Sequence, residues 1–353
     1  MIHIQILHIA NHVKECGNGI VNVMIDLACE QAKLGHKVAV ASSGGTYTEL
    51  LERNDVVHYK LNQTRRPVQI LRAFFHFRKI IKEFKPDIIH AHMMTGALLS
   101  RLFKGFHKYK IVTHVHNEFQ KSANVMKVGD SVIAVSKAVA ESMQSRGIHE
   151  NKLHVILNGT VGSSRKRNSP EVDLEGISII TVAGMYERKG ITELIEAFDI
   201  FAKEYEETHL YLIGEGPDKA RFETQASRSL YRDRIHFLGF QTAPQTFMKA
   251  ADIFVLASHK EPFGLVLIEA REAGCAIVAT EVDGIPEALD FGESGMLVPP
   301  QSPTELAKAI LNLLKDPDVM NAYRQKASQG LEYYTVERVA KDTLEIYQKL
   351  LIS

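Results

Sequence analysis

Two glutamates spaced eight positions apart, Glu261 and Glu269, are the residues of this sequence best placed to do chemistry. The first falls in a loop after an expected strand, and the second falls inside the helix expected over residues 264–273. Gly264 at the helix start lets backbone N–H groups approach a ligand closely. Because the free N-terminus of a helix attracts phosphate through its unpaired donors and its dipole, the segment predicts a site for an anionic ligand. A dipole-stabilised glutamate and a solvated glutamate on the same helix are the alternative interpretation.

Two cations, Arg188 and Lys189, lie at another turn where an expected strand gives way to a helix. Gly184 and Gly190 flank them and keep the backbone of the turn flexible. A guanidinium and an ammonium at such a turn can clamp a diphosphate, since both donate hydrogen bonds to phosphate oxygens. A surface pair of cations without a ligand is the alternative interpretation.

A third turn, between the first expected strand and the first expected helix, contains Gly17, Asn18 and Gly19. A glycine-rich turn before a helix can cradle phosphate with its backbone N–H groups. Two glycines alone carry little specificity, and a tight turn that only leads into the helix is equally consistent with these residues.

Four histidines end two further expected strands. Because side chains alternate along a strand, His114 and His116 point to one face of the sheet, and His90 and His92 have the same spacing. Histidine clusters can bind metal, but no set of Asp, Glu or Cys nearby completes a site, so we expect no metal here. For His90, His92 and His114 we expect local hydrogen bonds at the strand ends.

The elements that position these turns alternate between short apolar runs and amphipathic segments of helix length, which is typical of parallel sheets with crossover helices. In the first half, strands are expected over residues 2–10, 37–41, 56–61, 87–91, 110–116, 131–135 and 154–157. In the second half, strands are expected over residues 178–182, 209–213, 234–238, 252–257 and 276–280, and helices over 191–202, 264–273, 303–314 and 336–351.

A polar stretch between residues 159 and 176 has few groups able to enter a core, so it marks a linker between two domains. We predict an N-terminal Rossmann-like domain over residues 1–162 and a C-terminal one over 170–335, with the helix at 336–353 bracing the first. Two such doubly wound domains in tandem bind ligands at the carboxyl ends of their strands, so the site is expected in an interdomain cleft.

Bulk properties agree with a folded protein of two domains. The chain has 353 residues, of which 45% are hydrophobic and 24% charged. No apolar run reaches the length of a membrane-spanning helix, no signal peptide is apparent, and Cys16, Cys29 and Cys275 lack metal-ligand spacing, so a cytoplasmic location is expected. The chain has 42 basic and 42 acidic residues, yet residues 1–168 hold 24 Lys and Arg against 12 Asp and Glu. The first half could therefore face phosphate or anionic lipid.

The paired-glutamate segment resembles the motif of the retaining glycosyltransferases of family 4, which have the GT-B fold, and the resemblance extends over nearly the whole chain. It implies that Glu261 lies against the hydroxyls of the transferred sugar and that Glu269 binds the nucleotide ribose. It also implies that the backbone at Phe263, Gly264 and Leu265 contacts the sugar and the diphosphate.

The turn with Gly184 is similar to the family's glycine, arginine and lysine-glycine segment, whose basic pair neutralises the leaving diphosphate. Lys189 matches the lysine, whereas Met185 takes the place of the arginine, which leaves Arg188 as its substitute. The turn of Gly214, Glu215 and Gly216 also resembles a family segment and implies donor contacts at Glu215.

The first half carries further likenesses to the family. The turn with Gly17, Asn18 and Gly19 resembles the loop that approaches the donor phosphate, although the family's glycines are commonly adjacent. His116 aligns with the histidine that contacts the donor sugar. Asp283 stands where the family usually has glycine.

The resemblance implies a metal-independent retaining transferase, with no cofactor, that moves a sugar from a UDP-, GDP- or ADP-sugar to a glycan or lipid-linked acceptor in cell-surface polysaccharide synthesis. Nucleic acid is not an expected partner. The basic helix from Pro67 to Lys85 could dock on anionic lipid at the inner face of the membrane, or could be a solvated face. A sugar-nucleotide epimerase of the same fold and an inactive nucleotide-sugar-binding partner protein remain the alternatives.

Overall fold

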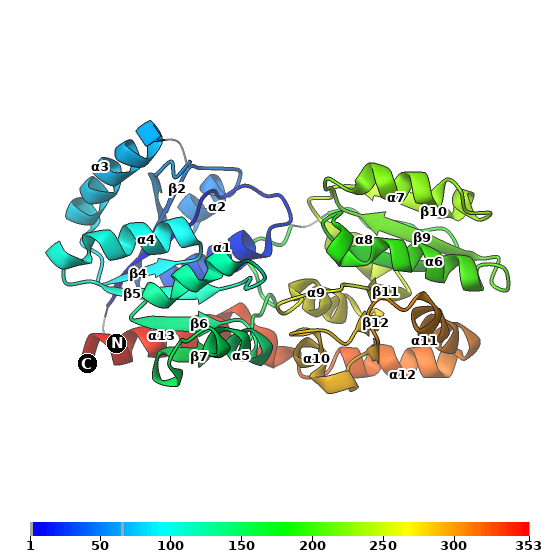
Figure 1. The fold of residues 1–353 in the computed structure, drawn as a ribbon. Helices are drawn as coiled ribbons and strands as arrows, with labels where there is room; N and C mark the ends of the chain where they lie inside the picture. The colour runs from blue at the N-terminus through cyan, green and yellow to red at the C-terminus, as the bar shows by residue number, and fades with distance from the viewer. Residues whose placement is uncertain (1–2, 65–66, 168, 353) are drawn as a thin grey trace. The chain divides into compact units, whose positions relative to one another are not determined.

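The computed structural model describes residues 3–64, 67–167 and 169–352. Ile2, Asn168 and Ser353, which fall in the predicted first strand, linker and last helix, lie outside the described residues. The chain divides into two compact units, Met1–Arg165 together with Tyr334–Ser353, and Lys166–Tyr333. Each unit is a parallel sheet with helices on its faces (Figure 1).

The first unit contains a seven-stranded parallel sheet in the order β3-β2-β1-β4-β5-β6-β7. The strands are β1 (Gln5–Ile9), β2 (Lys37–Ser42), β3 (Val57–Lys60), β4 (Ile88–Ala91), β5 (Lys110–Val115), β6 (Ser131–Ala134) and β7 (Leu153–Val155). β4 and β6 are buried along their whole length, because helices cover both faces of the sheet. These strands agree with the predicted ones to within a few residues.

The helices of the first unit are α1 (Gly19–Lys33), α2 (Thr48–Arg53), α3 (Pro67–Phe84), α4 (Met94–Phe103), α5 (Lys137–Ser145) and α13 (Val336–Ile352). Short 3-10 turns lie at η1 (Lys104–Phe106), η2 (Lys121–Val128) and η3 (Glu150–Lys152). Although α13 is the last helix of the chain, it packs against α1. Its buried side chains, among them Tyr347 at 0% exposure, therefore complete the core of the first unit.

The second unit contains a six-stranded parallel sheet in the order β10-β9-β8-β11-β12-β13. The strands are β8 (Ile177–Val182), β9 (Thr208–Ile213), β10 (Ile235–Gly239), β11 (Ile253–Leu256), β12 (Ala276–Thr280) and β13 (Met296–Val298). The sequence analysis missed β13, because three residues are too few to show an apolar period.

The helices of the second unit are α6 (Ile191–Phe201), α7 (Lys219–Ala226), α8 (Pro244–Ala250), α9 (Leu265–Ala273), α10 (Ile285–Ala288), α11 (Pro303–Lys315) and α12 (Pro317–Ala327). Further 3-10 turns are η4 (Glu187–Lys189), η5 (Arg232–Arg234), η6 (Asp290–Gly292) and η7 (Leu331–Tyr334). Among the helices in the described part of the chain, none is long and apolar enough to cross a membrane.

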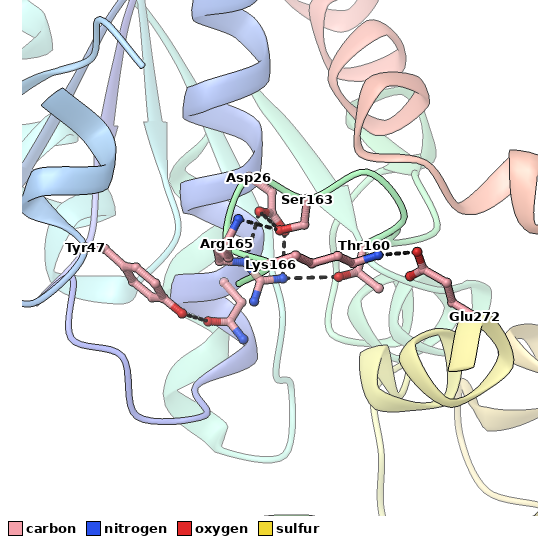
Figure 2. A network of polar contacts seen from close by, with 8 residues as sticks. Asp26, Tyr47, Thr160, Ser163, Arg165, Lys166 and Glu272 are labelled. Atoms are coloured by element: carbon pink, nitrogen blue, oxygen red, sulfur yellow. Dashed lines mark hydrogen bonds and ion pairs between the residues drawn. The ribbon is translucent and has the colours of Figure 1, made fainter. Parts of the chain in front are cut away.

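The linker is more ordered than its polar composition suggests. Arg165 donates two hydrogen bonds to the Asp26 carboxylate on α1, at 2.8 and 2.9 Å, and Ser163 donates a third at 2.6 Å (Figure 2). Asp26 is only 4% exposed, and its pairing offsets the cost of burying the charge. In the second unit, Lys166 pairs with Glu272 of α9. The predicted boundary lay between residues 162 and 170, and in the structure it lies at Arg165 and Lys166.

Candidate active site

In the second unit, the strand order changes direction at β8, which lies between β9 and β11. The loops that follow β8 and β11 therefore leave the carboxyl edge of the sheet on opposite sides, and this is where doubly wound sheets bind ligands. The loop after β8 contains Gly184, Arg188 and Lys189, and the loop after β11 contains Glu261. Two of the predicted segments thus flank the ligand-binding position of this sheet.

Lys189 and Glu261 form an ion pair across these two loops. Their side chains are 13% and 12% exposed, so both charges are largely removed from water. A pair in such surroundings persists only because each charge compensates the other. The structure therefore brings together two residues that lie 72 positions apart in the chain and that the sequence analysis assigned to one site.

Arg188 lies beside the same loop. Its guanidinium is 3.4 Å from the carbonyl oxygen of Lys260 and lies over the ring of Tyr186, 5.8 Å from the ring centre. The backbone N–H of His259 donates to the Arg188 carbonyl oxygen at 2.8 Å. Met185, which takes the place of the family arginine, is fully buried in the hydrophobic core. A cation at position 185 would face that core, whereas Arg188 stands next to the Glu261 loop.

Two glycines allow the loops to approach each other. Gly190 has φ 67°, and a Cβ there would lie 1.8 Å from the carbonyl oxygen of Ala257 at the end of β11. Gly264 has φ 86° and stands immediately before α9, so the helix begins with its first N–H groups uncapped by a side chain at that position. Phe263 is 2% exposed and anchors the loop in the core. Its side chain therefore fixes the backbone that the prediction assigned to donor contacts.

Glu269 lies on α9, and its side chain is partly buried, as is that of Leu265 in the first turn of the helix. Both residues belong to the helix that begins at the Glu261 loop.

Gly184 and Glu215 lie in neighbouring turns that are held to each other. The N–H of Met185 donates to the Glu215 carbonyl oxygen at 3.0 Å, and Asp218 accepts from the N–H of Glu187 at 2.8 Å. The Glu215 carboxylate accepts from Lys219 at 2.6 Å, so its charge is already paired. A Cβ on Gly184 would lie 2.9 Å from the ring of Tyr186, so a larger residue there would require this half-exposed ring to move.

Asp283 supports Glu261 in a way that the sequence analysis did not predict. Its carboxylate accepts from the Glu261 N–H at 2.8 Å, and the N–H of Gly284 donates to the Glu261 carbonyl oxygen at 3.1 Å. Burial raises the pKa of Asp283, although the hydrogen bond from Glu261 opposes the shift. Asp283 has φ 44°, a conformation that glycine adopts more easily, which agrees with the glycine that the family resemblance implies at this position.

In the first unit, the glycine turn leads directly into α1. Gly17 has φ 66°, Asn18 accepts from the N–H of Ile20 at 3.0 Å through its side chain, and Gly19 is the first residue of the helix. Asn18 is therefore the N-cap of α1. This capping role accounts for its presence between the two glycines.

The first unit also gathers five buried histidines on one side of its sheet. His92 and His116 lie just after β4 and β5, and His92 joins His116 and His8 through ring nitrogens, 3.0 Å apart in each case. His90 contacts the Tyr347 hydroxyl at 2.5 Å. The sequence analysis missed His8, because no second histidine lies two positions from it and it comes beside His90 only through the pairing of β1 with β4.

The expectation of local hydrogen bonds was wrong for His114. Within the described part of the chain, neither of its ring nitrogens has a hydrogen-bond partner, and its ring instead stacks on those of His90 and His116. Stacking on neighbouring rings, rather than a polar partner, holds this side chain in place.

Burial keeps the histidines uncharged. It lowers the pKa of His8 to about 4 and that of His116 to about 3, and it lowers the pKa values of His90, His92 and His114 well below 6.5. All five rings are therefore neutral at pH 7. Nitrogens of His8, His90 and His92, and of His92, His114 and His116, lie within 4.8 Å of one another.

The predicted residues thus form two groups. Lys189, Arg188, Glu261 and Gly264 lie on adjoining loops of the second unit, whereas Gly17, Gly19 and His116 belong to the first. Within each group, the structure places the residues at the carboxyl ends of parallel strands, where the sequence analysis expected them.

Sequence comparison assigns both units to known families. The profile of the group 1 glycosyl transferases matches residues 163–330, and the profile of glycosyltransferase family 4 matches residues 17–161. A structure of Anabaena Alr3699/HepE in complex with UDP-glucose is similar to this chain with a TM-score of 0.83, at 20% identity, and covers 98% of this chain and 100% of that one. The fold is that of the two-domain α/β GT-B class.

Curated relatives agree with this class. The lipopolysaccharide core biosynthesis glycosyltransferase LpsD of Rhizobium meliloti is 27% identical over 75% of each chain. The N-acetyl-alpha-D-glucosaminyl L-malate synthase of Bacillus anthracis is 25% identical over 95% of this chain and 94% of its own. The chain therefore belongs to the group 1, family 4 glycosyltransferases, and it is an enzyme of glycosyl transfer.

Proposed function

We propose that this glycosyltransferase is a retaining enzyme that moves a sugar from a nucleotide-sugar donor to a glycan or lipid-linked acceptor, in the synthesis of a cell-surface polysaccharide. The observation that carries the proposal is the Lys189–Glu261 ion pair. It lies beside β8 and β11, the neighbouring strands at which the strand order of the second sheet reverses. The pair holds an ammonium and a carboxylate in contact with each other, and we propose that Lys189 neutralises the leaving diphosphate and that Glu261 binds the sugar hydroxyls.

The donor supplies a leaving group on which charge develops as the bond to the sugar breaks. Fixed hydrogen-bond donors and cations stabilise that charge without rearranging during the reaction. In the second unit, Lys189 and Arg188 supply the cations, and the uncapped start of α9 supplies backbone N–H groups. Binding by these groups favours the departing diphosphate over the intact donor, which is the requirement for catalysis.

We propose that the acceptor attacks from the side that the diphosphate leaves. The bond between the anomeric carbon and the phosphate oxygen breaks, a bond to the acceptor oxygen forms on the same face, and the acceptor proton passes to the departing phosphate. The configuration at the anomeric carbon is thereby retained. No side-chain base is needed, so Glu261 and Glu269 bind the donor instead of acting as the acid and base of a hydrolase.

The remaining predicted residues complete donor binding in this proposal. Glu269 binds the ribose, and the backbone of Phe263, Gly264 and Leu265 faces the sugar and the diphosphate. Gly17 and Gly19 in the first unit offer backbone N–H groups to phosphate. Because cations of the chain supply the positive charge, we propose that transfer proceeds without a bound metal ion.

Incubation with a nucleotide sugar and an acceptor glycan, followed by proton NMR, tests the proposed reaction. We expect a product with the anomeric configuration of the donor, at a rate that a chelator such as EDTA leaves unchanged. A product of inverted configuration would contradict retention. An epimerised donor in the absence of acceptor would instead identify an epimerase, and the lack of any donor turnover would identify an inactive binding protein.

Two observations support a lipid-linked acceptor: the name of one relative, LpsD, and the exposed surface of helix α3. The relative LpsD is a glycosyltransferase of lipopolysaccharide core biosynthesis. On α3, Leu71 and Phe75 are 59% and 58% exposed, and Phe74 beside them is 37% exposed. Basic side chains follow on the same exposed side of the helix, at Arg78, Lys79 and Lys82. We propose that this α3 surface, residues 71–82, docks on anionic lipid at the cytoplasmic face of a membrane.

Vesicle flotation tests this docking. The double variant Arg78→Glu, Lys82→Glu should lower binding to vesicles that contain phosphatidylglycerol by at least about tenfold, since each basic residue near an anionic surface contributes roughly 1 kcal/mol. Lys152→Glu combined with Lys349→Glu, which reverses two exposed charges elsewhere in the first unit, is the control. Equal flotation of the two double variants, or no flotation of the wild type at low salt, would rule out the α3 surface as a docking site.

A further inference from the structure

Three of the five buried histidines of the first unit, His8, His92 and His116, belong to a continuous hydrogen-bonded chain in which the donor and the acceptor of each bond can be assigned. It runs from Tyr347 on α13 to Gln31 on α1, then to His8, His92 and His116, with heavy-atom separations of 3.5, 2.8, 3.0 and 3.0 Å. A neutral imidazole has one nitrogen that donates and one that accepts. The state of one end of the chain therefore determines the state of the other.

Tyr347 sets the direction. Its hydroxyl lies 3.5 Å from the amide nitrogen of Gln31 and 2.5 Å from the Nδ1 atom of His90. Because an amide nitrogen only donates, the phenolic oxygen accepts from Gln31, and the hydroxyl proton is left for His90. The amide nitrogen of Gln31 accordingly faces Tyr347, which leaves its carbonyl oxygen toward His8.

The remaining protons follow in order. His8 donates from Nε2 to Gln31, so its Nδ1 accepts from Nε2 of His92. His92 in turn accepts at Nδ1 from Nε2 of His116. The proton of His116 lies on Nε2, and its Nδ1 keeps a free lone pair. With 9% exposure, His116 is the most exposed of the five rings, so the chain ends at the ring nearest the surface.

We propose that this chain fixes His116 in the Nε2–H form, so that its Nδ1 accepts a hydrogen bond from a hydroxyl of the donor sugar. His92, His8, Gln31 and Tyr347 are positioning residues, which act through His116 without touching the substrate. The role in sugar binding rests on the proposed function, whereas the proton arrangement stands independently of it. Buried imidazoles remain neutral here, which the arrangement requires.

A metal site is the competing interpretation of the same rings. The lone pairs of an imidazole lie in the plane of its ring, so ligands of one ion must have planes that converge on it. In the group of His8, His90 and His92, the rings of His90 and His92 are 31° from parallel with centroids 4.2 Å apart. In the group of His92, His114 and His116, the rings of His114 and His116 are 24° from parallel with centroids 4.1 Å apart. Stacked rings direct their lone pairs side by side, so the hydrogen-bonded chain is the better account.

NMR of the full chain with 15N-labelled histidine tests the proton arrangement, because the two ring nitrogens differ in shift according to which of them carries the proton. We expect His8, His92 and His116 to be neutral with the proton on Nε2, and to be unchanged when equimolar Zn²⁺ is added. A proton on Nδ1 of His116, a charged ring, or shifts that show zinc bound to these rings would overturn the proposal.

The Tyr347→Phe variant tests the role of the chain. It keeps the aromatic ring but removes the group that orients Gln31, so a second form of His116 with its proton on Nδ1 should appear, and donor affinity should fall about three- to tenfold. Tyr109→Phe is the matched control, because it removes another buried hydroxyl of the first unit, which donates to the Ser100 carbonyl oxygen at 2.6 Å outside the chain.

The outcomes separate the two claims. If Tyr347→Phe leaves the state of His116 unchanged, the chain does not fix the tautomer and the proposal fails. If the tautomer of His116 changes but the donor affinity of Tyr347→Phe equals that of Tyr109→Phe, His116 does not accept a hydrogen bond from the donor sugar. If the wild type binds no nucleotide sugar, the proposed function fails, and the NMR result still decides the proton arrangement.

Discussion

Replacement of Lys189 by alanine is expected to lower kcat by about 10²–10³-fold, the effect of removing one preorganised donor from a developing oxyanion. Donor affinity should change by less than about tenfold, since Lys189 acts mainly on the charge that appears during departure of the diphosphate. Steady-state kinetics with a nucleotide sugar, together with calorimetric donor binding, separate the two quantities.

A control variant is needed because Lys189→Ala also affects Glu261, the ion-pair partner of Lys189. The substitution leaves the Glu261 carboxylate unpaired in a largely buried position, which by itself can cost several kcal/mol of stability. Lys166→Ala breaks another lysine–glutamate pair, with Glu272 of α9, whose side chains are 35% and 30% exposed, without touching the two loops. We expect near wild-type turnover for Lys166→Ala, measured below the unfolding temperature of both variants. A kcat for Lys189→Ala within threefold of that control would remove Lys189 from the mechanism.

Acidification is expected to destabilise the first unit before the second. Each of the five buried histidines binds a proton in the unfolded chain below about pH 6.5 but stays neutral in the native state, so the unfolded state binds more protons and stability falls as pH falls. Between pH 7 and pH 5 this amounts to roughly 2 kcal/mol for each ring. Five rings lose on the order of 10 kcal/mol, as much as the whole stability of a typical domain.

Hydrogen exchange resolved by segment measures this effect in each unit. The amides of β4 and β5, which carry His90 and His114, should lose protection between pH 6.5 and pH 4 once the known pH dependence of intrinsic exchange is corrected. The amides of β11 and β12 in the second unit should keep more of theirs. Unchanged protection of β4 and β5 at pH 5 would show that the rings are not buried neutral in the native state.

The sequence predicts the fold well because continuous apolar runs mark the buried strands of both sheets. Strands such as Ala276–Thr280 are buried along their whole length and appear as continuous apolar segments, so their place needs no tertiary information. The predicted site loops were located for the same reason, since each follows such a strand and carries a glycine. Family resemblance assigned Arg188 and Lys189 to the same donor site as Glu261. The structure adds the ion pair of Lys189 with Glu261 and the contact of Arg188 with the Lys260 carbonyl oxygen.

What the sequence could not predict depends on contacts between distant segments. Asp283 appears in sequence only as a departure from glycine, and its hydrogen bond to Glu261 follows from where two loops meet. His8 carries a signal only once β1 is known to lie beside β4 with His8 paired to His90. Arg165 was interpreted as part of a polar linker, because nothing in its neighbourhood shows that Asp26, 139 positions away, accepts from it.

The measurement that tests the central claim most directly is calorimetric titration of the wild type and Glu269→Ala with UDP-, GDP- and ADP-sugars. We expect the wild type to bind at least one of them and Glu269→Ala to bind it about 10- to 100-fold more weakly, as expected for loss of hydrogen bonds to a charged group. Glu272→Ala, which removes another carboxylate from α9, should bind it as the wild type does. Equal affinity of all three proteins, or no binding of any nucleotide sugar to the wild type, would contradict a donor site at Lys189, Glu261 and Glu269.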